Sequence, residues 1–202
     1  MAFLLTASIF VLGIFLGIIM SDFKTSKIYS YERDLMTNLI TQDIQSELLE
    51  ADPCSFISSG LVSQELFIVG DRLDALEKEL GKDDEQVIGL KQYYTLLEVK
   101  DYLYFKKVND ECNATFILNL FFYSNDHKKC ERCEDQGFVL SYARIKNDNI
   151  RTYSFDSDID IPVVNYLVAY YNVTELPTNV FNGEVYHGFI NTEKVEDIIE
   201  NE

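Results

Sequence analysis

The strongest constraint on the fold is an apolar run in the second half of the chain that leads toward a pair of cysteines. Residues 115–124, with the sequence TFILNLFFYS, are an almost continuous apolar and aromatic run. Such a run is typical of a strand that is buried on both faces of a sheet. Cys130 and Cys133 follow shortly afterwards, with two charged residues between them. The sequence therefore predicts a buried strand that ends near a Cys-x-x-Cys motif.

The segments after the motif alternate between helix and strand. Periodicity and turn residues predict helices at 134–147, 162–173 and 192–200, and strands at 150–158 and on both sides of a turn at Asn182-Gly183. Phe138, Tyr142 and Ile145 fall on one side of the first of these helices, and Thr192 is the expected N-cap of the last. The predicted fold class of this half is α/β.

This order of elements resembles the thioredoxin fold, and the resemblance covers residues 113–202. The resemblance implies that Pro177, in the sequence ELPT, is a cis-proline that faces the Cys-x-x-Cys motif. It also implies that Leu176 and Pro177 line the groove in which a substrate strand pairs. Cys130 would be the attacking thiol at the exposed end, and Cys133 would resolve the mixed disulfide from one turn deeper.

Two residues depart from the thioredoxin pattern. Thioredoxins carry a Trp directly before the first cysteine, and Lys129 stands at that position here. They also carry a buried acid in the first strand, where Phe121 stands here and Asn119 is a polar near match. A fast general reductase is therefore not expected. A slower oxidase, isomerase or reductase with a dedicated client stays open, and so does a non-catalytic thioredoxin-like module that binds or scaffolds partners at the membrane.

The charges around the motif oppose one another. A cysteine attacks as the thiolate, which a helix N-terminus and nearby cations stabilise. Cations at 128, 129 and 132 favour the thiolate, and acids at 131, 134 and 135 disfavour it. Two alternatives compete with redox chemistry. A zinc site with His127 lacks a second cysteine pair, and a purely structural disulfide over so short a loop removes little chain entropy.

Cys54 and Cys112 are expected to form a structural disulfide. The bridge would close a loop of about sixty residues, which the chain-entropy model credits with about 4 kcal/mol. It would join the helical region to the domain that follows, and it requires an oxidising compartment. The alternative is two separate buried thiols, since free cysteine is often a small core residue.

The sequence of the first half of the chain predicts a membrane anchor followed by a helical region. Residues 2–20 are apolar and uncharged, long enough for a single-pass transmembrane helix and unlike a cleavable signal peptide. The following helices, one of which ends at Gly81, form a small antiparallel region that could also mediate oligomerisation. The predicted division is therefore an anchor at 1–22, a helical region at 23–111 and a thioredoxin-like domain at 112–202.

Composition restricts partners and location. The net charge of −17 argues against nucleic-acid binding. Lys24 and Lys27 after the span would place the body in the cytoplasm by the positive-inside rule. The four cysteines and two N-x-T sequons, at Asn113 and Asn172, favour an extracytoplasmic body instead. We therefore expect an extracytoplasmic body. The expected partners are protein clients that carry thiols or disulfides, and membrane lipid around the N-terminal helix. No phosphate-binding loop or metal cluster is recognised, so we expect no cofactor and no metal.

Overall fold

The computed structural model describes residues 13–15, 37, 40–41, 43–58 and 63–201. The chain divides into two units, Met1–Glu50 and Ala51–Glu202, and all the strands that the structure describes lie in the second. Among the described residues, no helix is both long and apolar enough to cross a membrane. The predicted span at 2–20 lies outside the described residues except for 13–15.

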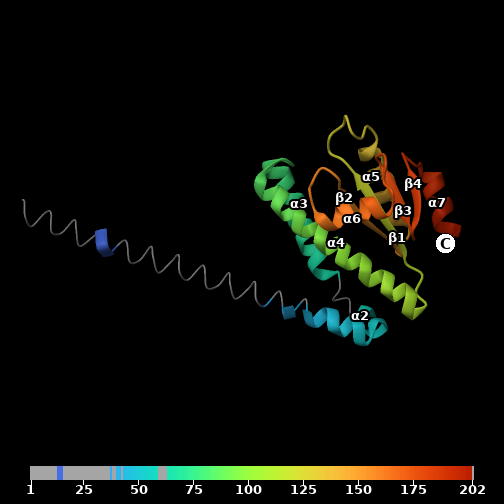
Figure 1. Ribbon diagram of the computed structural model, residues 1–202, viewed down its shortest axis with the longest axis horizontal. Helices are drawn as coiled ribbons and strands as arrows, with labels where there is room; N and C mark the ends of the chain where they lie inside the picture. The colour runs from blue at the N-terminus through green and yellow to red at the C-terminus, as the bar shows by residue number, and fades with distance from the viewer. Residues whose placement is uncertain (1–12, 16–36, 38–39, 42, 59–62, 202) are drawn as a thin grey trace, which may run out of the picture. The chain divides into compact units, whose positions relative to one another are not determined.

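A mixed four-stranded sheet in the order β2-β1-β3-β4 forms the centre of the second unit (Figure 1). The strands are β1 Ile117–Tyr123, β2 Ile150–Asp156, β3 Thr178–Phe181 and β4 Glu184–His187. β1 and β2 are parallel, whereas β3 runs antiparallel to both β1 and β4. Six of the seven residues of β1 are buried, which confirms the prediction of a strand covered on both faces.

The β3–β4 hairpin turns at the predicted dipeptide. Asn182 has φ 45° and Gly183 has φ 98°, the left-handed conformations that a tight hairpin turn requires at its two central residues. The side chain of Asn182 also accepts a hydrogen bond from the Leu118 N–H at 2.9 Å. The turn is therefore fixed both by its own backbone preference and by a bond to the central strand.

Six helices surround the sheet in the described part of the second unit. They are α2 Pro53–Ser58, α3 Gln64–Leu80, α4 Glu85–Cys112, α5 Cys133–Lys146, α6 Pro162–Tyr170 and α7 Thr192–Asn201. α3 stops at Gly81, whose φ of 87° suits glycine, as predicted. The expected N-cap of α7 is wrong by one residue, because the Asn191 side chain accepts from the Lys194 N–H at 2.9 Å and Thr192 is already helical.

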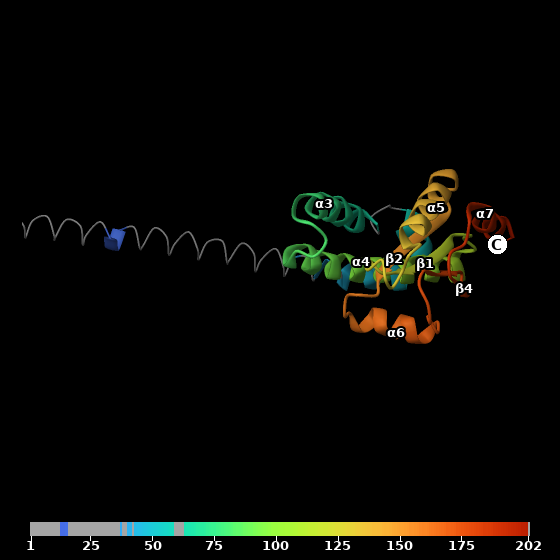
Figure 2. The same ribbon diagram turned by 90° about the horizontal axis from the view of Figure 1, so that it is seen from above.

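The helices cover the two faces of the sheet in pairs (Figure 2). On one face, α4 and α6 pack against β1 and β2 in a first core cluster that includes Tyr102, Phe122, Phe155 and Val164. On the other face, α5 and α7 form a second core cluster, which includes Leu140, Phe181 and Val195 as well as Cys130 and Cys133. The unit is therefore a three-layer α/β/α arrangement.

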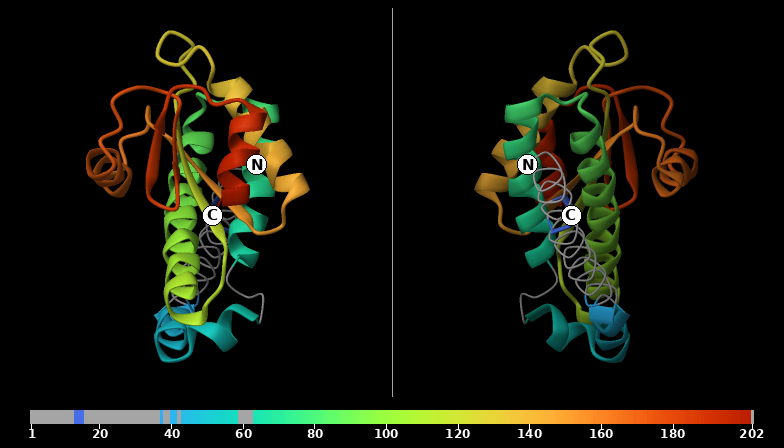
Figure 3. Two further views of the ribbon diagram at one scale, coloured as in Figure 1. Left: turned by 90° about the vertical axis from the view of Figure 1, so that its right-hand side faces the viewer. Right: turned by 90° about the vertical axis from the view of Figure 1, so that its left-hand side faces the viewer.

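The long helix α4 belongs to the same core as the sheet. Its residues Val99, Tyr102 and Phe105 lie in the first core cluster, and Figure 3 shows α4 in green alongside the strands. The Glu98 side chain also accepts a hydrogen bond from the Ser154 N–H of β2 at 2.8 Å. α4 and the sheet thus share one hydrophobic core, because apolar side chains of α4 pack against β1 and β2.

The apolar stripe predicted on α5 faces outward. Phe138 is 67% exposed and Ile145 is 80% exposed, and Tyr142 is exposed as well. The buried face of α5 instead carries Cys133, Gln136, Leu140 and Ala143. Helical spacing therefore identified a real stripe but not the face that packs against the sheet.

Candidate active site around Cys130 and Cys133

The two cysteines lie between the end of β1 and the start of α5. β1 ends at Tyr123, a polar loop follows, and Cys133 is the first residue of α5. Cys130 and Cys133 are joined in a disulfide. The pair therefore sits at a helix N-terminus, where free backbone N–H groups and the helix dipole favour a negative sulfur when the pair is reduced.

Hydrogen bonds inside the loop set the position of Cys130. The Asp126 carbonyl accepts from the N–H groups of Lys129 and Cys130, at 2.9 and 3.0 Å. The Asp126 N–H donates to Ser124 Oγ, and the Asp126 side chain accepts from the Lys128 N–H, both at 2.9 Å. The loop is thus organised around one aspartate rather than being a loose connection.

Two of the cations beside the motif are paired with carboxylates. Lys129 forms an ion pair with Asp158. Arg132 Nε lies 3.0 Å from Asp135 Oδ2, and the Arg132 guanidinium lies 3.5 Å from the ring centroid of Phe189. Burial alone would raise the pKa of Asp158, but hydrogen bonds from Lys129 and Ser124 outweigh it and hold that pKa below its usual value. These pairings reduce the positive potential that the sequence places around the cysteines.

Cys130 is buried, contrary to the expectation that the first cysteine lies at the exposed end. It is 4% exposed and Cys133 is 6% exposed. Both belong to the second core cluster together with Phe121, and the partly buried Leu176 packs against that cluster. A client sulfur reaches Cys130 only if the side chains that cover it move.

Leu176 and Pro177 lie between α6 and β3. The peptide bond between them is cis, and Pro177 is buried. Leu176 packs against both core clusters, the second of which includes the cysteine pair. The first residue of β3, Thr178, is anchored by its hydroxyl, which donates to the Glu175 carbonyl at 2.7 Å.

Buried amides occupy the polar positions on the cysteine face of the sheet. Asn119 Nδ2 donates to Asn179 Oδ1 at 3.2 Å, and Gln136 Oε1 accepts from the Ile190 N–H at 2.8 Å. All three amide side chains are fully buried. Sequence reasoning noticed Asn119 inside the apolar run but missed Asn179 and Gln136. Amides do not donate protons as an acid does, so the proton-transfer role of the thioredoxin acid has no counterpart at these positions.

The histidines lie away from any metal-binding arrangement. His127 is exposed in the loop, and His187 Nδ1 lies 3.2 Å from Thr178 Oγ1. Within the described ranges, no group of three or more His, Cys, Asp or Glu residues is placed to hold a metal ion.

Cys54 and Cys112 are also joined in a disulfide, with a sequence separation of 58. Cys54 lies in the short helix α2, and Cys112 is the last residue of α4. The bridge therefore ties α2 to the C-terminal end of α4, away from the Cys-x-x-Cys motif in sequence.

Comparisons with known proteins do not assign a family. No protein-family model matches the chain, and no curated protein matches it. A solved structure described as "Structure of a malarial protein" matches 43% of this chain and 97% of its own, at 16% identity and a TM-score of 0.37. Similarity at that level carries no argument about fold or function.

Proposed function

We propose that this chain is a membrane-anchored, thioredoxin-like thiol–disulfide oxidoreductase that acts on protein clients through Cys130 and Cys133. The observation that carries the proposal is the disulfide at the N-terminus of α5, packed in one cluster with Leu176, which precedes the cis-proline Pro177. The strand order, with one parallel and two antiparallel pairings, is compatible with a thioredoxin-like fold.

The reaction begins from the disulfide form. A client thiolate attacks Cys130 Sγ, the bond between Cys130 and Cys133 breaks, and Cys133 leaves as a thiolate that takes up a proton. A second client thiolate then attacks the client sulfur of the mixed disulfide and releases Cys130. Two electrons pass from the client dithiol to the cysteine pair, and the client gains a disulfide. The same steps in reverse reduce a client disulfide.

Leu176 and Pro177 provide the surface for client binding in this proposal. They directly precede β3, and Leu176 packs against the core cluster that contains both cysteines. A client strand that displaces the side chains over Cys130 would expose the sulfur at the moment of binding. Access would then depend on the correct client, which suits a dedicated rather than a general oxidoreductase.

We also propose that the apolar segment 2–20 anchors the protein and that its body is extracytoplasmic. Two disulfides suit an oxidising compartment. Both sequon asparagines, Asn113 and Asn172, are exposed and have positive φ. Labelling intact cells with a membrane-impermeant thiol reagent, with and without reductant, tests the topology. Labelling only after the cells are broken would place the body in the cytoplasm.

A second candidate is a non-catalytic thioredoxin-like module that binds partners at the membrane. The burial of Cys130 favours it, because a working nucleophile must be reached. The amides Asn119, Asn179 and Gln136 favour it too, since none of them transfers a proton to Cys133 as a carboxylic acid would.

Trapping separates the two candidates. In the variant Cys133→Ser, a catalytic Cys130 holds its clients as mixed disulfides that survive non-reducing electrophoresis. The double variant Cys130→Ser/Cys133→Ser is the matched control and should trap nothing. Adducts that require Cys130 support the oxidoreductase. Their absence, in membranes where an established oxidoreductase traps its clients, supports the binding module.

A further inference from the structure

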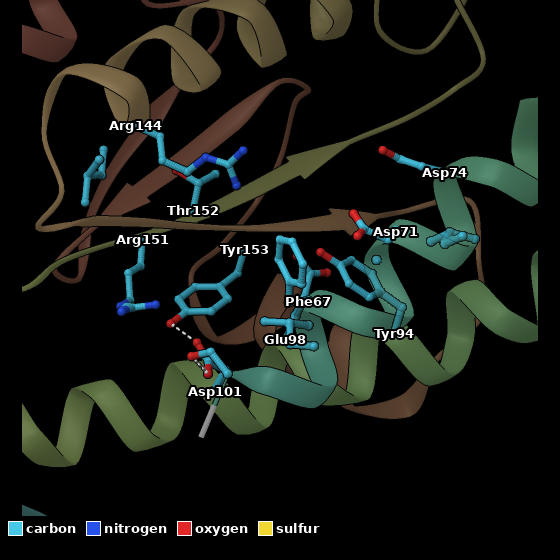
Figure 4. A pocket seen from close by; sticks show the side chains of 15 residues that line it. Phe67, Asp71, Asp74, Tyr94, Glu98, Asp101, Arg144, Arg151, Thr152 and Tyr153 are labelled. Atoms are coloured by element: carbon cyan, nitrogen blue, oxygen red, sulfur yellow. Dashed lines mark hydrogen bonds between the residues drawn. The ribbon is translucent and has the colours of Figure 1, made fainter. Parts of the chain in front are cut away.

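A polar cavity lies between α3, α4, α5 and the outer strand β2 (Figure 4). Its volume is about 360 Å³, within the range of small-molecule sites. A second cavity of about 190 Å³ has four lining residues in common with the first: Tyr94, Glu98, Arg144 and Thr152. No cysteine lines either cavity, so this site is separate from the proposed redox chemistry.

A buried carboxylate with an open oxygen lines the cavity. Glu98 is 2% exposed. Its Oε1 accepts from the Ser154 N–H at 2.8 Å, whereas Oε2 is buried and has no hydrogen-bond partner among the described residues. A buried polar atom without a partner costs free energy, and native structures contain few of them. The open oxygen therefore calls for a donor that occupies the cavity.

Thr152 supplies a second open acceptor. Its Oγ1 is buried without a partner in the described part of the chain, and the residue lines both cavities. The neighbouring carboxylate Asp101 is different, because its two oxygens already accept from Ser63 at 2.7 Å and Tyr153 at 2.8 Å. Among the described residues that line the cavity, Glu98 Oε2 and Thr152 Oγ1 are thus buried acceptors left for a ligand, and Arg151 Nε is a buried donor that also lacks a partner.

The charges around the cavity favour a cation. Four carboxylates line it, at Asp71, Asp74, Glu98 and Asp101, against two guanidinium groups. One of these, on Arg151, points away in Figure 4 and stacks 3.6 Å from the centroid of the Phe105 ring. The other, on Arg144, belongs to an exposed residue, as do the carboxylates of Asp71 and Asp74, so the buried charges of the lining are those of Glu98 and Asp101.

Aromatic rings complete the cavity. Tyr94 and Tyr153 line it from α4 and β2, and Phe67 lines it from α3 although it is 70% exposed. Gly70 leaves space for Tyr94, since a Cβ added there would lie 3.1 Å from the Tyr94 ring. Aromatic faces beside a carboxylate are a common environment for organic cations.

We propose that this cavity binds a small organic molecule with a primary ammonium group, with Glu98 as its counter-ion. The ammonium donates to Glu98 Oε2 and Thr152 Oγ1, and the rings of Tyr94 and Phe67 contact its hydrocarbon part. A primary ammonium fits better than an anion, because an anion would face the acceptor oxygens of Glu98 and Thr152, which line the cavity.

The test is a calorimetric titration of the full chain, with both disulfides intact, with 2-phenylethylammonium. The neutral control is 2-phenylethanol, which has a hydroxyl in place of the ammonium. We expect the alcohol to bind at least about tenfold more weakly, since a charged hydrogen bond to a buried carboxylate is worth at least 1.4 kcal/mol. Glu98→Gln should weaken amine binding by a similar factor, because its amide presents an N–H where the open oxygen was.

Two further variants keep the proposal falsifiable. Thr152→Val removes the second acceptor and should weaken amine binding about three- to fivefold. If circular dichroism shows that Glu98→Gln does not fold, the affinity of Thr152→Val for the amine tests the proposal instead. Arg144→Gln should leave amine affinity unchanged or improve it. Equal affinity for amine and alcohol, no amine binding at millimolar concentration, or dependence on Arg144 but not on Glu98 would each overturn the proposal.

Discussion

Lys91 of α4 and Asp156 at the end of β2 form a buried ion pair, with Nζ and Oδ2 separated by 2.8 Å. Their side chains are only 8% and 4% exposed. Asn125, in the loop before the cysteines, donates to the same Asp156 oxygen at 2.6 Å, and Lys82 Nζ donates to Asn125 Oδ1 at 3.1 Å. The pair therefore connects α4 and the sheet to the loop that carries Cys130.

Breaking this pair should destabilise the fold strongly. Lys91→Met leaves the Asp156 carboxylate buried without its cation, and we expect the free energy of unfolding to fall by about 3–5 kcal/mol. Urea denaturation of the variant and the parent chain measures this loss.

The matched control is the surface pair Lys146–Glu196, whose side chains are 56% and 43% exposed. Lys146→Gln should cost at most about 1 kcal/mol, because water screens exposed charges. A similar small loss for Lys91→Met would mean that Asn125 and the surrounding backbone satisfy Asp156 without the lysine.

The two disulfides should contribute unequally to stability. The chain-entropy model gives about 4 kcal/mol for the Cys54–Cys112 bridge, with its separation of 58, and about 2 kcal/mol for the Cys130–Cys133 bridge, with its separation of 3. Urea denaturation should therefore show a larger loss in the free energy of unfolding for one double variant than for the other. The larger loss is expected for Cys54→Ala/Cys112→Ala, and the smaller for Cys130→Ala/Cys133→Ala. The reverse order would show that packing at the Cys-x-x-Cys motif matters more than loop closure.

Glu98 should make stability depend on pH. Without a cation in the cavity, burial raises the pKa of Glu98 well above its usual value, so the ligand-free folded protein holds that proton more tightly than the unfolded chain does. The resulting stabilisation is complete below about pH 4.3, the pKa of an unperturbed Glu, and is lost as the pH rises through the folded-state pKa.

Glu98→Gln removes this dependence. The free energy of unfolding of the variant, relative to the parent, should rise with pH by about 1.4 kcal/mol per unit across that window. Urea denaturation at a series of pH values from 4 to 9 measures the difference. Parallel curves for the two proteins would contradict the prediction, because Glu98 would then titrate alike in the folded and unfolded states.

Elements that depend on local chemistry were predictable from the sequence. The turn at Asn182-Gly183 and the stop of α3 at Gly81 follow from backbone conformations that few residues adopt. The central strand follows from a long apolar run that suits few other environments. In each case the residues that determine the structure are neighbours in the chain.

Features that depend on distant partners were not predictable. The inward face of α5 is decided by contacts such as the one between Gln136 and the Ile190 N–H, which lie 54 positions apart. The outward stripe with Phe138 and Ile145 has an equally good helical spacing, so periodicity alone could not choose between them. The core cluster that buries Cys130 likewise draws on Phe181, Val195 and Ile198, which come from other segments.

The ion pair between Lys129 and Asp158 should control the reactivity of Cys130. Lys129 directly precedes that cysteine, and Asp158 holds its ammonium group. In the Cys133→Ser background, Cys130 is a free thiol while the Cys54–Cys112 bridge stays closed. Asp158→Asn then leaves the Lys129 charge uncompensated, which lowers the pKa of the Cys130 thiol by stabilising its thiolate.

We expect Asp158→Asn to speed alkylation of Cys130 by iodoacetamide about two- to fivefold at pH 7 and low salt. The effect should shrink at high salt, because added ions screen exposed charges. Lys129→Gln in the same background should cancel the gain, so that the double variant reacts at about the parent rate. A gain that persists in the double variant would attribute the effect to a looser loop around Cys130 rather than to the lysine charge.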